Sequence, residues 1–420
     1  MKKRSKDQKI KLSREERKEL KKQKKEDERF SISSAEYAAL ENEERAFWAP
    51  VKPKYERIPI FCYILFGLAA ICAIVYLISF ISPEFADFFN INIGSAVRSF
   101  IATITGILPF SLAELIIILI PFIAFIMVWY FSKFRCETNR SAIVSVVCIL
   151  SAVALLFSMF VVNLGIGYKG SSLDEKLGIK SGPVNAKELY ASTVYLAEKI
   201  NELEPEIYYD AENFSIMPYD FATLNEKLLE AYDKFAADHY FIKNFKSRLK
   251  PVMLSEPMSY THITGVYTFF TGESNINVNF PDYTLPFTAA HELAHQRGIA
   301  REDEANMIAF LVCIGSDDLY IRYSAYMNMY EYFSSALYSA DKALYKKAAR
   351  NLIIDAQNEM IAYGDFFEKY ERSVASKVSG TVNDVYLKTQ GTAGRQSYGM
   401  VVDLTVAYLK NESLIEFEQK

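Results

Sequence analysis

The sequence predicts a membrane protein in two parts: three N-terminal transmembrane α-helices, then a mainly α-helical α+β domain with a small sheet. Three observations support this prediction. Three long segments before residue 168 are apolar and almost free of charge. Apolar residues recur at helical spacing from residue 184 onward, and residues 260–280 are β-branched or alternate in the manner of strands. The 420 residues leave room for one membrane unit and one domain.

The first 57 residues are expected to form a basic cytoplasmic arm. Residues 1–30 carry 14 Lys and Arg against 7 Asp and Glu, although the whole chain has a net charge of −4. Such a charge excess is also typical of segments that bind nucleic acid. The position next to an apolar segment favours an arm held near anionic lipid, and no nucleic-acid partner is predicted.

The membrane domain is predicted at residues 58–168, with crossings at 58–83, 112–131 and 142–164. The first and third segments lack charged residues, and Glu114 is the one charge in the second. Each is long enough to span a bilayer. Residues 91–110 contain Arg98, Gly106 and Pro109, which is too interrupted for a fourth crossing. They are expected to form an amphipathic surface helix or a re-entrant segment.

Loop charges predict the orientation of these crossings. The arm and the loop at 132–141 are basic, which places both in the cytoplasm by the positive-inside rule. Three crossings then place the rest of the chain outside. We therefore expect a multi-pass protein of the cell membrane with an extracytoplasmic domain at 184–420, joined by a Gly/Ser/Lys-rich linker at 169–183. The sequence does not indicate an oligomeric state.

Helices are expected in this domain at 184–203, 221–235, 241–249, 305–314, 319–338 and 341–363, with a final helix near the C-terminus. Between them lies the pentapeptide His291-Glu-Leu-Ala-His295, in a chain with only four histidines. Residues four apart share a helix face, so two imidazoles can hold one zinc ion while Glu292 serves as general base. The alternative is an exposed helix with two ordinary histidines. Gly298 is the expected end of the helix.

A catalytic zinc usually has three protein ligands and a water molecule. Glu302 is the expected third ligand, Glu304 is its rival, and Asp303 is less favoured. Asn306 lies four residues after Glu302 and is expected to hydrogen-bond a ligand histidine. Alternatively, these acids only stabilise the N-terminus of a helix.

The strand before the motif is a candidate edge strand that pairs with an extended substrate, and the alternative is a hairpin that only packs on the helix. Its candidate substrate residues are Glu273, Asn275, Asn277 and Asn279. Candidates for stabilising an oxyanion are Tyr398, Arg395 and His262. The alternatives are an ordinary connection between helices for the first two and a structural role for His262.

The element Glu302-Asp-Glu-Ala-Asn306 resembles the Glu-x-x-Ala-Asp/Asn element of gluzincin peptidases, although the gap from His295 is shorter than is common there. This resemblance implies a zincin-like domain with Glu302 as ligand. Arg301 stands where metzincins have a third histidine. The segments 271–279, 285–296, 302–306, 386–388 and 397–399 together resemble the bacterial membrane-protein family named domain of unknown function 3810. That resemblance implies a membrane-bound zinc metallopeptidase without naming a substrate.

The sequence supports two functional hypotheses. The first is a membrane-anchored zinc-dependent peptidase that hydrolyses peptide or protein substrates outside the cytoplasm. The second is a non-catalytic zinc-containing binding or regulatory module of the cell envelope. In the second, four protein ligands close the metal site, which requires His239 and His262 to converge on it.

Overall fold

The computed structural model describes residues 13–19, 21–23, 39, 42, 57–133, 139–371 and 373–415. The predicted basic arm therefore lies mostly outside the described residues. The chain divides into two compact units, and the larger one is made of residues 58–127 and 145–420. Three apolar segments are helices long and apolar enough to cross a membrane, as predicted: Ile60–Ser79, Leu112–Trp129 and Ala142–Asn163.

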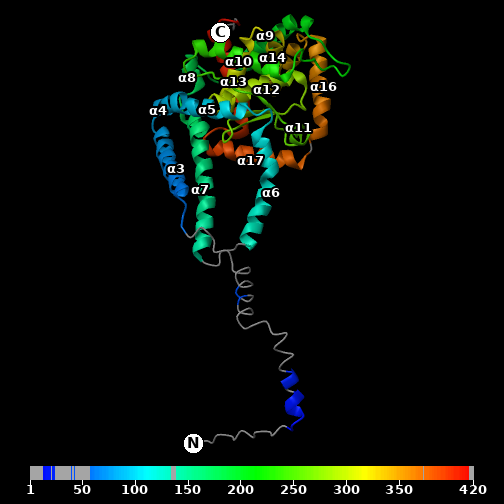
Figure 1. Ribbon diagram of the computed structural model, residues 1–420. Coiled ribbons are helices and arrows are strands. Elements are labelled where there is room, and N and C mark those ends of the chain that lie inside the picture. The colour runs from blue at the N-terminus through cyan, green and yellow to red at the C-terminus, as the bar shows by residue number, and fades with distance from the viewer. Residues whose placement is uncertain are drawn as a thin grey trace, which may run out of the picture. The chain divides into compact units, whose positions relative to one another are not determined.

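These segments belong to α3 (Ile60–Ser79), α6 (Leu112–Lys133) and α7 (Asn139–Asn163). The C-terminal end of α3, the N-terminal end of α6 and the C-terminal end of α7 all adjoin the folded domain (Figure 1). Residues 83–111 and the chain after residue 163 consequently lie at the same end of the three apolar helices (Figure 1).

The segment at residues 91–110 is helical as far as Gly106, and its position relative to a membrane stays a prediction. A π-helical turn, η1 (Phe89–Gly94), leads into α5 (Ser95–Gly106). Arg98 on α5 is only 1% exposed and donates to Asn90 Oδ1 at 2.8 Å. Asn90 Nδ2 in turn donates to the carbonyl of Gly298 at 2.9 Å. One face of α5 is thus fixed to the domain beside the end of the motif helix.

The remainder of the described domain is helical apart from one small sheet. Its elements are α4 (Pro83–Phe88), η2 (Gly165–Lys169), α8 (Leu173–Leu177), α9 (Ala186–Leu203), η3 (Glu204–Glu206), α10 (Phe221–Asp238), β1 (Lys250–Pro251), α11 (Ser255–Ser259), β2 (Gly265–Thr268), β3 (Glu273–Ile276), η4 (Asp282–Thr284), α12 (Leu285–Gln296), α13 (Glu302–Ile314), α14 (Leu319–Ala340), α15 (Lys342–Ala349), α16 (Ile354–Glu371), α17 (Val374–Thr389), η5 (Gly394–Met400) and α18 (Val401–Asn411).

The sheet has the strand order β1-β3-β2. β1 pairs with β3 in parallel, with Lys250 opposite Asn275, and β2 pairs with β3 antiparallel, with Val266 opposite Asn275. The predicted edge strand is therefore the central strand. The two-residue strand β1 flanks one side of β3 and β2 flanks the other, so β1 and β2 are the two edge strands.

Two further segments differ from expectation. The expected linker at 169–183 is folded: Leu173 is 1% exposed, and its backbone N–H donates to Glu304 Oε1 at 3.0 Å. The expected helix at 241–249 is an irregular segment between α10 and β1. Phe241, Ile242 and Leu249 of this segment are buried, as helical spacing suggested. Its backbone is nevertheless paired with α10, because Leu249 N donates to Asn225 Oδ1 at 3.0 Å.

Candidate metal centre

The motif lies on α12, and all twelve residues of this helix are buried. Pro286 stands in its first turn, and Gly298 follows its end with a φ of +99°, a left-handed conformation that glycine adopts without strain. Ser274 of β3 donates to the Glu292 carbonyl at 2.9 Å. Tyr232 of α10 donates to the Ala290 carbonyl at 2.6 Å. Hydrogen bonds from two sides thus fix the position of the helix.

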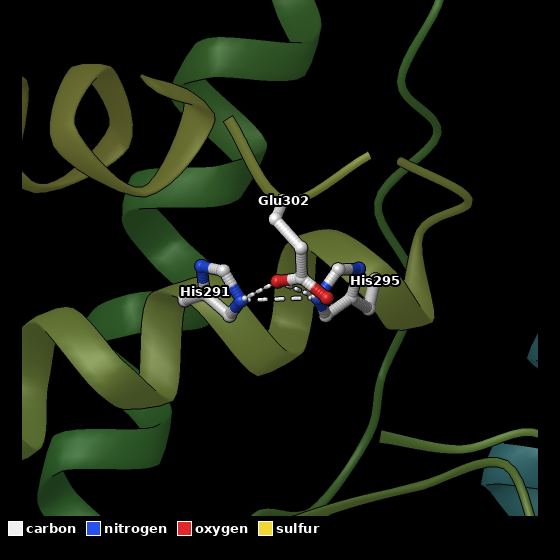
Figure 2. A group of neighbouring side chains, drawn as sticks. All are labelled: His291, His295 and Glu302. Carbon is white, nitrogen blue, oxygen red and sulfur yellow. Dashed lines mark hydrogen bonds and ion pairs between the residues drawn. The ribbon is translucent and has the colours of Figure 1, made fainter. Parts of the chain in front are cut away.

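Three side chains converge above this helix (Figure 2). The Nε2 atoms of His291 and His295 are 3.0 Å apart, and Glu302 Oε2 lies 3.2 Å from the first and 3.4 Å from the second. All three residues are buried, and their ligand atoms lie within 4.8 Å of one another. His295 Nδ1 donates to the Ile299 carbonyl at 2.7 Å, which leaves the Nε2 lone pair free for a metal.

The tight turn after α12 explains how Glu302 reaches the two histidines although only six residues separate it from His295. Gly298 reverses the chain, and Glu302 begins α13, which packs closely against α12. Glu304, the rival ligand, instead accepts from Leu173 N and from Arg301 Nη1, each at 3.0 Å. Its carboxylate therefore joins the folded 169–183 segment to α13 and has no place in the cluster.

Charge within the cluster shifts the pKa values of its members in opposite directions. Burial alone would raise the pKa of Glu302, but the charge of His295 and the hydrogen bonds of both histidines hold that pKa well below its usual range. Burial alone would lower the pKa of His295, yet the Glu302 carboxylate raises it to about 9. In the absence of a metal the cluster thus holds a proton, which a bound metal must displace.

The surroundings of Glu292 indicate whether a metal ion with a bound water molecule fits beside His291, His295 and Glu302. Its Oε2 atom is buried and has no hydrogen-bond partner among the described residues. Burial raises the pKa of this carboxyl, although the nearby histidines oppose the shift. A β-carbon added to Gly265 would lie 2.7 Å from the Glu292 side chain, so only glycine allows β2 to approach so closely. The unpartnered oxygen and the donor set fit a metal-bound water molecule.

The cluster opens into a cleft of about 970 Å³ that is bounded by β2, α12, α14, α16 and α17. Its acidic lining residues are Glu292, Glu302 and Glu331, and the described lining contains no Lys or Arg. Burial raises the pKa of Glu331 to about 7. Tyr332 and Tyr386 also line the cleft. The sequence had no local signal for Glu331 or Tyr332, and Tyr386 appeared only within a family-like segment.

The candidate substrate residues of β3 point elsewhere. Glu273 accepts from the backbone N–H groups of Leu112 and Ala113 at 3.1 and 2.9 Å and thereby caps the N-terminus of α6. Asn275 Oδ1 accepts from Ser111 at 2.6 Å. The described residues that line the cleft do not include Glu273, Asn275, Asn277 or Asn279. Glu273 and Asn275 thus join the sheet to the first turn of α6 and to the residue before it.

Asn277 and Asn279 both donate to Ser259 Oγ of α11, at 3.0 Å each. Asn306 lines the cleft, but its amide donates to the Tyr332 hydroxyl at 3.3 Å rather than to a histidine. His262 also lines the cleft, and its Nε2 donates to the Tyr370 carbonyl at 2.8 Å, which ties the ring to α16. The side chains of Arg395 and Tyr398 lie outside the described residues, so their predicted role stays a prediction.

No curated protein and no solved structure is detectably similar to the chain. One family model matches residues 90–406, which is most of the chain and includes α5, the sheet, the metal-ligand cluster and α17. By this match the chain belongs to the family described as Protein of unknown function (DUF3810).

Proposed function

We propose that this protein is a membrane-anchored zinc-dependent peptidase. The observation that carries the proposal is the buried cluster of His291, His295 and Glu302 beside an unpartnered oxygen of Glu292. Two neutral imidazoles and one carboxylate form the ligand set of many catalytic zinc sites, where a fourth position remains open for water. Loop charges further support the proposal that the domain is extracytoplasmic.

In the proposed reaction, Glu292 accepts a proton from the attacking water and passes it to the leaving amine. A bound zinc ion would polarise the scissile carbonyl and lower the pKa of the water. The raised pKa of Glu292 suits this role, because the carboxyl must hold a proton between the two transfers. His291 and His295 would hold the metal from one helix face, and Glu302 would complete the ligand set from the next helix.

The free edge of β2 supports peptide binding. The Thr264 carbonyl accepts from Asn277 N at 2.8 Å, so by the two-residue alternation of antiparallel pairing the backbone groups of Gly265 and Tyr267 face away from β3. Both residues line the cleft, where the Tyr267 N–H also lies against the Glu292 carboxyl. An extended substrate can therefore pair with this edge through backbone hydrogen bonds that do not depend on its sequence.

Two tyrosine hydroxyls are the proposed donors to the developing oxyanion. Tyr332 and Tyr386 line the cleft on different helices, α14 and α17, and the charge of Glu302 contributes to the pKa of each. Burial raises the pKa of Tyr386 to about 12, which keeps its hydroxyl protonated at neutral pH. A protonated phenol at this place can donate to an oxyanion.

The test is metal analysis of the purified full chain, paired with digestion of a peptide library by the wild type and by Glu292→Gln. We expect one zinc ion per chain in both proteins, and a loss of turnover in the variant of about 10²–10⁴-fold, as is typical for removal of a general base. Equal turnover in the two proteins would contradict the mechanism. Zinc without turnover in the wild type would instead favour the binding or regulatory module.

The described residues disfavour a closed structural site. His239 Nδ1 hydrogen-bonds the Phe235 carbonyl at 2.8 Å, and His262 is bound to Tyr370. Neither belongs to the cluster of close ligand atoms found in the described part of the chain. A fourth protein ligand from these histidines would require both α10 and the α11–β2 connection to move.

A further inference from the structure

Helix α17 exposes a row of four valines, of which Val382 also borders the cleft. Val374, Val378, Val382 and Val385 are 76%, 59%, 64% and 57% exposed, and their spacing of four, four and three residues places them in one row. We propose that this row lies in the membrane interface, and that the cleft beside it takes polypeptide segments adjoining a membrane anchor. The second half of this proposal rests on the proposed peptidase function, whereas the first half does not.

The C-terminal end of α17 contacts residues inside two of the apolar spans. Tyr76 of α3 donates to Gln390 Oε1 at 3.1 Å, directly after α17. The rings of Phe160 in α7 and Tyr386 in α17 have centroids 6.3 Å apart. Tyr76 and Phe160 each lie about one helical turn, or roughly 5 Å, before the domain-side end of their span. This end of α17 is therefore at the depth of the outermost turn of the membrane-spanning helices.

The N-terminal end of α17 is anchored near the remaining span, α6. Ser373 hydrogen-bonds the carbonyl of Tyr260, which directly follows α11. The backbone N–H groups of Met253 and Leu254, just before α11, donate to Glu114 in the first turn of α6. In Figure 1, α17 runs across the domain side of the spans between α6 and α7. Contacts at both ends thus place α17 beside the domain-side ends of the three apolar helices.

A second helix on this side of the domain has the same character. Phe100, Ile104 and Ile107 in and just after α5 are 68%, 51% and 76% exposed, while Arg98 and Ala102 on its other face are buried against the domain. Met253, beside the contact with α6, is 81% exposed. These apolar side chains continue the apolar surface of the spans. A bilayer around the spans is the one surface that covers all of them at once.

The cleft meets this surface. Leu164, the first residue after the span Ala142–Asn163, lines the cleft together with Tyr168 and Val382. A polypeptide that enters between β2 and α17 therefore passes at the level of the lipid headgroups. An extended chain covers about 3.3 Å per residue, so a bond within about ten residues of an anchor reaches the metal cluster without unfolding a substrate domain.

Tryptophan quenching by brominated lipid tests the position of α17. With both native tryptophans replaced by Phe, single tryptophans are introduced as Val378→Trp or, as a second test, Val385→Trp, with Glu198→Trp on α9 as the exposed control. In phosphatidylcholine–phosphatidylglycerol vesicles we expect brominated chains to reduce emission from the α17 positions by at least about half, with no change for the control. Equal emission in both lipids at 378 and 385 would overturn the interfacial position.

A ruler experiment tests the substrate class. Proteoliposomes of the full chain are given a degenerate library of about 24-residue peptides, palmitoylated at one end or free, and cut positions are mapped by mass spectrometry. We expect anchored peptides to be cut mostly within about ten residues of the lipid, with Glu292→Gln as the inactive control. Cuts confined to positions more than about 15 residues from the lipid would overturn the inference. If neither library is cut, hydrolysis fails together with the substrate class, and the quenching result still decides the position of α17.

Discussion

The two helices that face each other across the cleft differ in almost every respect. On α12 all twelve residues are buried, and neighbouring elements hydrogen-bond its backbone at Ala290 and Glu292. On α17 only Leu387 is buried, and four valines are exposed. α12 has its ligands fixed before any metal arrives. The outer face of α17 is apolar and unfavourable in water, so we expect the position of this helix to depend on whether lipid or water surrounds it.

This difference separates two requirements of the proposed membrane-bound peptidase. A metal site needs ligands held to within about half an ångström, which the close packing of α12 favours and which the hydrogen bond from His295 Nδ1 to the Ile299 carbonyl supports. Access for a membrane-anchored substrate requires that one side of the cleft, here α17, adjoins the lipid bilayer. The comparison therefore predicts that changes on the α12 side alter metal content, whereas changes on α17 alter turnover with the metal retained.

The largest effect is expected for Glu302→Gln, with Glu304→Gln as the matched control. The two residues lie two positions apart on α13, and both are buried. Only Glu302 contacts the histidines. We expect Glu302→Gln to weaken zinc binding by more than about 100-fold, since even partners of metal ligands change affinity by 10–100-fold. Metal content measured by mass spectrometry against a competing chelator checks this.

Glu304→Gln should keep its zinc and lose thermal stability instead, because Gln cannot replace the charge opposite Arg301. The opposite result would refute the ligand set: the Glu304 variant would lose zinc and the Glu302 variant would keep it.

A change in turnover rather than in metal content is expected for Tyr386→Phe on the α17 side. Phe keeps the ring contacts with Phe160 and Tyr168 but removes the hydroxyl. Loss of one oxyanion donor typically lowers kcat by about 10²–10³-fold. We expect a loss in that range with full zinc content. The control is Tyr76→Phe, which removes a hydrogen bond to Gln390 after the same helix without touching the cleft lining. Equal losses in the two variants would mean that the hydroxyl acts only through helix position.

The parts of the fold that depend on local periodicity were predictable. Hydrophobic length identified the three spans, and the four-residue spacing of the two histidines placed both on one helix face. The site needed one further step, the turn at Gly298, which the glycine itself indicated. Glu302 was then within reach because it is the first residue of the next helix.

The rest depends on contacts distant in sequence. Strand alternation shows which face a residue occupies but not whether a strand is central, and β1 is only two residues long with a buried lysine. Glu273 therefore appeared as a substrate residue although it caps a helix 160 residues earlier. Tyr386 and Glu331 reach the cleft through packing of α17 and α14, for which their neighbours in sequence contain no signal.

The smallest predicted effect follows from a difference in pKa between two carboxyl groups of the same cleft. Glu302 faces two histidines, so its pKa is lowered, whereas Glu331 faces the Tyr283 hydroxyl at 2.7 Å and the charge of Glu359. Burial raises the pKa of Glu331 to about 7, with Glu359 adding to the shift and the Tyr283 hydrogen bond opposing it. An unfolded chain ionises this group near about pH 4.3. Between these two pKa values the folded state binds more protons than the unfolded state, so the contribution of Glu331 to stability decreases as pH rises and levels off above about 7.

Glu331→Gln removes this titration and keeps an acceptor for Tyr283. We therefore expect the wild type to lose more of its Tm than the variant as the pH rises from about 4.5 to about 7.5, and the two Tm curves to run parallel above that range. Thermal unfolding of the full chain in detergent across this pH series measures the difference. Parallel curves over the whole series would show that Glu331 is ionised in the folded cleft already near its ordinary pKa. In that case water reaches Glu331 on α14 more readily than its burial indicates. The difference in exposure between the α12 side of the cleft and its other walls would then be smaller than the structure suggests.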